Sequence, residues 1–74
     1  MDEILLQRRF GSAVRKRRLA SGRSQDTFAD AIGMHRAYFS SIERGERNVT
    51  LQTMKRVAEG LGATVASLMS DAEI

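Results

Sequence analysis

Residues 24–48 read SQDTFADAIGMHRAYFSSIERGERN, with Gly33 near the middle. Apolar residues recur at intervals of three or four on both sides of this glycine, which is the spacing of one face of an α-helix. Glycine adopts positive φ without strain, so it can end one helix and let the chain turn sharply into the next. The stretch therefore predicts two short helices joined by a tight turn, over about residues 24–45. Their apolar positions are Phe28, Ala29, Ile32, Phe39 and Ile42.

Three further helices are predicted around this pair. The first covers about residues 3–20, the fourth follows a cap at Thr50 and ends at Gly62, and the fifth covers about residues 64–70 behind a cap at Thr64. No segment alternates apolar and polar residues with a period of two. The chain is therefore expected to be a single all-α domain of five helices over residues 1–74. The apolar positions of these three helices are Leu6, Phe10, Val14, Leu51, Met54, Val57, Ala58, Leu61, Val65, Leu68 and Met69.

The composition of the chain favours some classes of function and argues against others. The first 47 residues hold ten Lys or Arg against six Asp or Glu, and the remaining residues hold two against three, so the positive charge lies in the first part. A basic surface favours a polyanionic partner, although solubility alone would also explain it. With no Cys and a single His, neither a catalytic pair nor a metal site is expected, so we predict no enzyme and no cofactor. The lack of Cys and of a long apolar run fits a cytoplasmic protein without a membrane segment.

Two charges fall on apolar stripes. Arg18 follows Val14 by four residues, and Glu43 follows Phe39 by four, so both point inward. A buried charge requires a partner of opposite sign. We therefore expect Arg18 and Glu43 to form an internal ion pair.

The short turn at Gly33 is typical of a helix-turn-helix, in which a small residue such as Ala29 lets the two helices approach. Residues 24–48, together with NVTLQTMKRVAEGLGATVASLM at residues 48–69, resemble the Cro/repressor (XRE-type) helix-turn-helix family. The resemblance implies a compact domain of phage-repressor type. Within the family, HRAYFSSIERGERN is most similar to the controller proteins of restriction–modification systems. His35 and Ala37 depart from the family pattern, because His is a weak cap and Ala offers a base only its methyl group.

The resemblance also implies which residues contact double-stranded DNA. Arg36, Ala37 and Tyr38 correspond to the front of the recognition helix, and Ser41 to a groove-facing position one turn later. Arg36 would donate two hydrogen bonds to a guanine, the alternative being a phosphate contact or a solvated side chain. For Tyr38 the alternative is that it covers the edge of the core. The positions that match phosphate contacts are Gln25, Arg44, Arg47 and Asn48.

Asp26 and Asp30 lie four residues apart on the exposed side of the second predicted helix. In some phage repressors, acids at matching positions contact RNA polymerase, so the resemblance suggests the same role here. The alternatives are stabilisation of the helix dipole by Asp26 and solubility for Asp30.

The fifth helix is apolar for a surface element. Val65, Leu68 and Met69 would either close the core or form a two-fold homodimer interface. Such a dimer would hold two recognition helices roughly 34 Å apart, one turn of DNA. The cluster of Ile4, Leu5 and Leu6 is an alternative or additional interface.

The predicted function is a transcriptional regulator that binds a palindromic operator as a homodimer. The controller resemblance implies that it activates and represses its own gene and the endonuclease gene. An antitoxin, or a phage-type repressor with the same fold, is the alternative.

Overall fold

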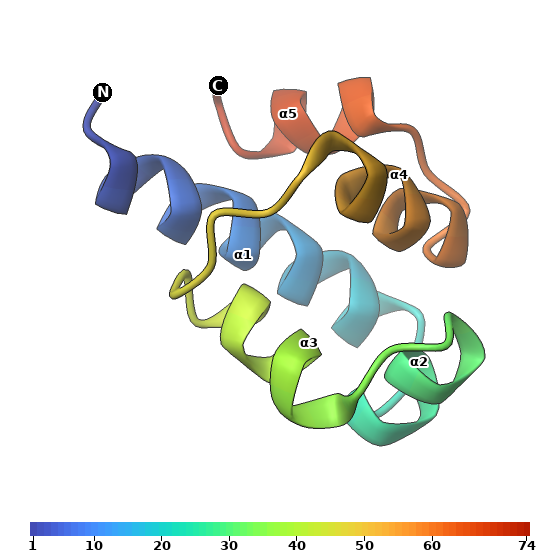
Figure 1. The fold of residues 1–74 in the computed structure, drawn as a ribbon. Helices are drawn as coiled ribbons and strands as arrows, with labels where there is room; N and C mark the ends of the chain where they lie inside the picture. The colour runs from blue at the N-terminus through green and yellow to red at the C-terminus, as the bar shows by residue number, and fades with distance from the viewer.

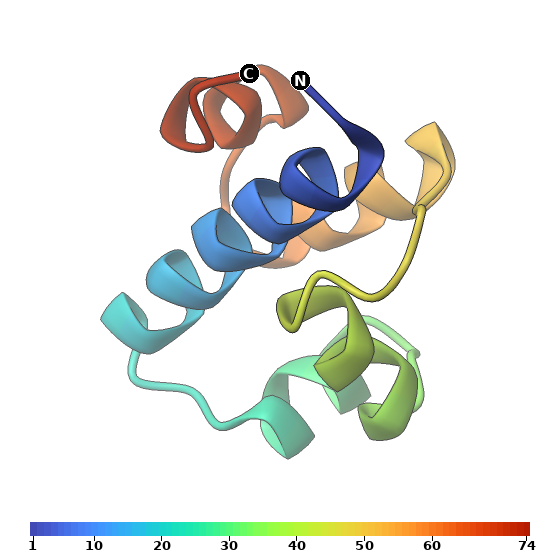
Figure 2. The same cartoon turned by 90° about the vertical axis from the view of Figure 1, so that its left-hand side faces the viewer.

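The computed structural model describes residues 1–74, and all of its regular structure is helical. The long helix α1 runs across the molecule, with α2 and α3 on one side of it and α4 and α5 on the other (Figures 1 and 2). The prediction of an all-α domain with five helices is confirmed. The helices are α1 (Glu3–Ala20), α2 (Gln25–Ala31), α3 (Arg36–Glu43), α4 (Leu51–Gly60) and α5 (Val65–Asp71).

Side-chain oxygens cap four of the five helix N-termini. Ser24 accepts a hydrogen bond from the backbone of Thr27 at 3.1 Å, and Thr50 accepts one from Thr53 at 3.1 Å. Asp2 caps α1 and Thr64 caps α5 in the same way. His35 makes no such bond at the start of α3, as expected from its side chain. The caps explain why sequence alone located the helix starts well, since each satisfies backbone N–H groups that the helix leaves unpaired.

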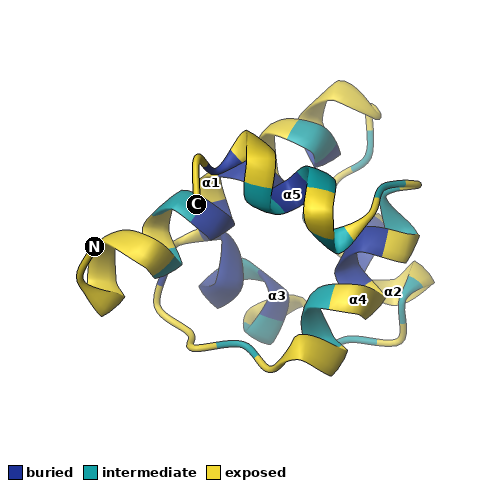
Figure 3. Ribbon diagram, turned by 90° about the horizontal axis from the view of Figure 1, so that it is seen from above, coloured by how far each residue is buried: buried dark blue, intermediate teal, exposed yellow.

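Each helix contributes at least one fully buried apolar side chain to a single core. Phe28 from α2 and Phe39 from α3 form its centre, with ring centroids 4.9 Å apart. In Figure 3 the buried parts of the helices turn toward a common interior. The side chains at 0% exposure, one from each of α1 to α5 in order, are Val14, Phe28, Phe39, Val57 and Leu68.

Three apolar side chains lie elsewhere than predicted. Leu6, placed on the apolar stripe of the first helix, is 39% exposed. Leu68 was expected at a dimer interface, but it is 0% exposed within its own chain. It fills the gap between α5 and the other helices and cannot reach a second copy. Leu51 was placed on the inner stripe of α4, yet it is 69% exposed, because the first residue of that helix projects past the edge of the core.

Tight packing of α1 and α2 against α3 sets the position of the helix-turn-helix. Gly33 has a φ of +67°, which confirms the positive φ expected at the turn. On the other side of α3, Gly11 of α1 packs directly on the α3 backbone. A methyl group at Gly11 would lie 2.7 Å from the carbonyl oxygen of Glu43, so only glycine permits this approach. No helix of the chain is both long and apolar enough to cross a bilayer.

Candidate DNA-binding surface

Helix α3 has two faces of opposite character. Phe39 and Ile42 are 0% and 2% exposed and anchor the helix in the core. Arg36, Ala37 and Arg44 are exposed on the other side. The helix is thus fixed by its apolar side and offers a cationic side to solvent, which is the arrangement that a recognition helix requires.

A buried ion pair joins α3 to α1. Nε of Arg18 lies 2.7 Å from Oε2 of Glu43, and Nη2 lies 3.0 Å from Oε1, so the contact is bidentate. The hydrogen bond to Glu43 raises the pKa of Arg18 above its ordinary value. The two inward charges of the sequence do therefore meet. Nη1 of Arg18 also donates to the carbonyl of Arg23 at 2.8 Å.

Gln25, expected at a phosphate, belongs to this same network. Its amide donates a hydrogen bond to Oε1 of Glu43 at 2.8 Å, and the residue is half-buried. The bond ties the first turn of α2 to the end of α3. Nothing in the sequence pattern indicated it, because the partner lies in another helix. Asn48, a second expected phosphate contact, is exposed in the loop between α3 and α4.

Arg36 carries an acidic partner from α2. Its Nε lies 3.4 Å from Oδ1 of Asp26, and the two side chains are 63% and 76% exposed. The pair brings together a residue expected to contact a base and one expected to contact polymerase. Asp30 is exposed and belongs to none of the chain's ion pairs.

Arg44 is also paired. It donates to both carboxylate oxygens of Glu46, at 3.1 and 3.0 Å, and to Oγ of Ser40 at 2.6 Å. These bonds hold the pKa of the Glu46 carboxyl below its ordinary value, with a smaller contribution from the charge of Arg47. The acid at position 46 was not singled out from the sequence, although its spacing from Arg44 in the loop permits the contact.

Ser41 corrects a prediction. It was expected to face the groove, but it is only 4% exposed. Its Oγ donates to the carbonyl of Tyr38 at 2.6 Å and accepts from Nε of Arg47 at 2.9 Å. Position 41 therefore lies beneath the loop that follows α3. Helical spacing alone could not show this, because it does not describe how the loop folds back.

Arg47 lies across Tyr38, with its guanidinium carbon 5.3 Å from the ring centroid. Tyr38 is half-buried and packs against the core with its other side. Both expected roles of the ring, covering the core edge and standing at the DNA-facing surface, are therefore compatible with its position.

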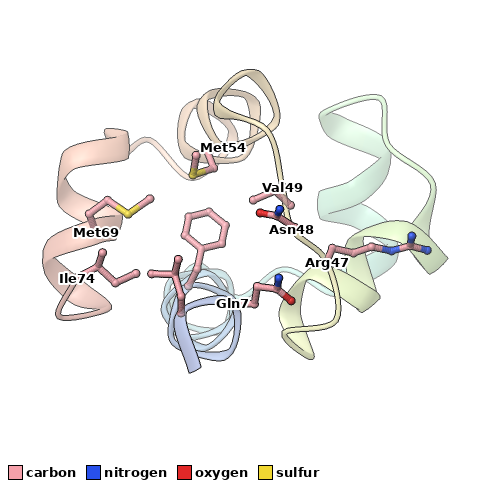
Figure 4. Close-up of a pocket in the computed structure, with 9 residues that line it drawn as sticks. Gln7, Arg47, Asn48, Val49, Met54, Met69 and Ile74 are labelled. Carbon is pink, nitrogen blue, oxygen red and sulfur yellow. The ribbon is translucent and has the colours of Figure 1, made fainter. Parts of the chain in front are cut away.

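An apolar groove of about 200 Å³ lies where α1, α4 and α5 meet, and Arg47 and Asn48 of the loop after α3 also line it (Figure 4). Met69 of α5 and Met54 of α4 face each other across it, and Ile74 closes one end. Leu6, one of the three residues of the N-terminal cluster, also lines it. Val65 is half-buried against the core and does not line the groove.

The helix-turn-helix family matches residues 14–68, so the chain belongs to the helix-turn-helix family of DNA-binding transcriptional regulators. Among curated relatives, control protein C.MunI of Mycoplasma sp. is 44% identical over 74 residues, which cover 99% of this chain and 97% of the relative. Control protein C.BamHI of Bacillus amyloliquefaciens is 41% identical, with coverage of 81% and 75%.

Solved structures show the same fold. The restriction–modification controller protein C.AhdI from Aeromonas hydrophila superposes with a TM-score of 0.80 at 37% identity, over 84% of this chain and 94% of that one. The clp gene regulator ClgR from C. glutamicum gives a TM-score of 0.89 at 31% identity, over 92% and 87%. These relatives are named as regulators, and the resemblance expected from the sequence is confirmed.

Proposed function

We propose that the chain is a sequence-specific regulator that places α3 in the major groove of a palindromic operator. The observation that carries this proposal is the division of α3 into a buried apolar face and an exposed face bearing Arg36 and Arg44. Arg36 stands at the first turn of the helix, where recognition helices contact base edges. Arg44, Arg47 and Asn48 would contact the flanking phosphates and fix the register.

We also propose that two copies bind together through the apolar groove. The exposed Leu6 lines it, and the exposed Leu51 lies one helical turn before the lining residue Met54 on α4. Met69 from the predicted interface also lines it. A domain of 74 residues buries little apolar surface by itself, so covering such a groove with a second copy stabilises both.

The comparisons support a controller role for this regulator. Three curated control proteins are each more than 40% identical to the chain, and one of them matches nearly its whole length. In this role the homodimer activates its own gene and that of the endonuclease at low concentration and represses them at high concentration. Asp26 and Asp30, on the side of α2 that faces away from the core, are the proposed contacts for RNA polymerase.

Selection of binding sites from random duplex DNA tests the DNA-binding proposal. The enriched sequences should be palindromic, and affinity for them should fall steeply with salt, because phosphate contacts release counterions. Failure to enrich any sequence would contradict the proposal.

A reporter gene tests the controller role. The selected operator is placed upstream of a weak promoter, and the protein concentration is raised stepwise. Expression should rise and then fall. Replacing both Asp26 and Asp30 by Ala should abolish the rise and leave DNA binding at least as strong. Repression at every concentration would favour a phage-type repressor instead.

A further inference from the structure

Ser41 uses both hydrogen-bonding capacities of its hydroxyl inside the protein. It donates to the Tyr38 carbonyl and accepts from Nε of Arg47, at 2.6 and 2.9 Å. With 4% of its surface exposed, it cannot reach a base. Because its hydroxyl is buried and accepts a hydrogen bond from Nε, Ser41 instead restricts the conformations of the Arg47 side chain.

The aromatic ring of Tyr38 supplies the second constraint. The guanidinium carbon of Arg47 lies 5.3 Å from the ring centroid, within the distance at which a cation is attracted to an aromatic face. The ring itself is held by the core beneath it. Arg47 is therefore fixed at its Nε and along its guanidinium face, although it lies in a loop.

The Nη edge of the Arg47 guanidinium forms no hydrogen bond within the chain. Hydrogen bonds within the chain engage only its Nε, which leaves the two Nη nitrogens and their N–H groups available. Arg36 and Arg44 are paired with Asp26 and Glu46, whereas Arg47 is in none of the four ion pairs. In Figure 4 its side chain extends away from the apolar groove and along α3. It thus carries a charge that is in no ion pair at the side of the recognition helix.

We propose that Ser41 is a positioning residue which, with Tyr38, holds Arg47 ready to bind a phosphate of the DNA backbone. This inference rests on the proposed function. Fixing a long side chain before binding removes most of the entropy that would be lost on contact, which corresponds to about 2- to 10-fold in affinity. Because a phosphate contact is blind to sequence, the gain applies to every duplex alike.

A thermodynamic cycle of Ser41→Ala and Arg47→Ala tests the inference. Dissociation constants are measured for the operator selected by the unmodified chain and for a random duplex. Ser41→Ala should weaken both by about 2- to 10-fold and leave their ratio unchanged. In the Arg47→Ala background it should have no further effect. Ser12→Ala, which removes an exposed hydroxyl from α1, is the matched control and should bind normally.

Three outcomes would overturn the inference: no loss in Ser41→Ala, a change in its sequence preference, or an undiminished loss when Arg47 is already absent. A failure of Arg47→Ala itself to weaken binding would instead count against the phosphate contact in the proposed function. The two failures are therefore distinguishable.

A second measurement needs no DNA. The Nε–H order parameter of Arg47 in the free protein, measured by NMR, should exceed that of the exposed Arg56, whose side chain forms none of the chain's hydrogen bonds or ion pairs. Equal mobility of the two side chains would contradict the proposed restraint. In Ser41→Ala the order parameter of Arg47 should fall toward that of Arg56.

Discussion

Arg18 and Glu43 connect α1 to the end of α3 through a bidentate contact that is almost wholly buried. Removing one partner leaves the other charge without compensation in the interior. Glu43→Gln should therefore lower the free energy of unfolding by about 3–5 kcal/mol in urea titrations. The double variant Arg18→Met with Glu43→Leu should lose less stability than either Arg18→Met or Glu43→Leu alone. A double variant whose loss equals the sum of the single losses would show that the two charges act independently.

Asp26 forms an ion pair with Arg36 on the exposed side of α3, and Asp30 has no ionic partner. Asp26→Asn frees the charge of Arg36, which lies 3.4 Å away, to approach any phosphate. We expect its affinity for random duplex to exceed that of Asp30→Asn by about two- to five-fold, the usual size of an exposed pair. Each change removes one negative charge, so the difference between the affinities of the two variants measures the effect of the ion pair. Equal affinities in filter-binding or anisotropy assays would show that the pair does not restrain Arg36.

At the scale of single residues, sequence reasoning succeeded where a helix period met a chemical requirement. Arg18 and Glu43 were found because a charge on an apolar stripe must be paired. It failed for Ser41, since the helix period places that residue near the exposed side and only the folded loop shows that Arg47 covers it. The partners of Arg36 and Gln25 were missed for the same reason, as each lies on another helix.

Helix α5 is held to α1 by an ion pair as well as by Leu68. The hydrogen bond from Arg17 holds the pKa of the Asp71 carboxyl below its ordinary value of 3.8. Because the folded state favours the ionised form, the pair stabilises the chain above that value and ceases to do so as the pH falls through the lower folded pKa. Asp71→Asn should therefore be less stable than the unmodified chain near neutral pH. In thermal unfolding at several pH values, the difference should vanish in strong acid; a difference that persists there would exclude the ion pair as its cause.

Among the elements, the starts of α4 and α5 followed from the caps at Thr50 and Thr64, and each of the first four helices ends two residues before a glycine. Which surface of a helix meets its own core was harder to predict, because an apolar stripe looks the same whether a neighbouring helix or a second copy covers it. For this reason Leu68 was predicted at a dimer interface but is buried within the chain. Leu51 was predicted in the core but is exposed. The close approach of α1 to α3 at Gly11 is likewise visible only in three dimensions.

The whole molecule has two candidate functional surfaces, the cationic side of α3 and the apolar groove between α1, α4 and α5. If the groove joins two copies, charges at its rim should separate them. Leu6→Asp combined with Leu51→Asp should give a monomer in sedimentation experiments. Its affinity for a full palindrome should fall by at least about 100-fold, because the two half-sites are no longer bound together.

Leu19→Asp is the matched control for this variant, since Leu19 is 55% exposed at the far end of α1 and does not line the groove. It should remain a dimer with normal operator affinity. Dissociation by Leu19→Asp, or a persistent dimer in the double variant, would place the interface elsewhere.

Sequence preference in Arg36→Ala tests most directly whether the exposed face of α3 reads bases. The quantity to measure is the ratio of dissociation constants for random duplex and selected operator. Losing a bidentate contact to a base should lower this ratio by about 5- to 150-fold. Arg15→Ala, which removes an exposed charge from α1, should leave the ratio unchanged. A ratio that is the same in Arg36→Ala as in the unmodified chain would contradict the account.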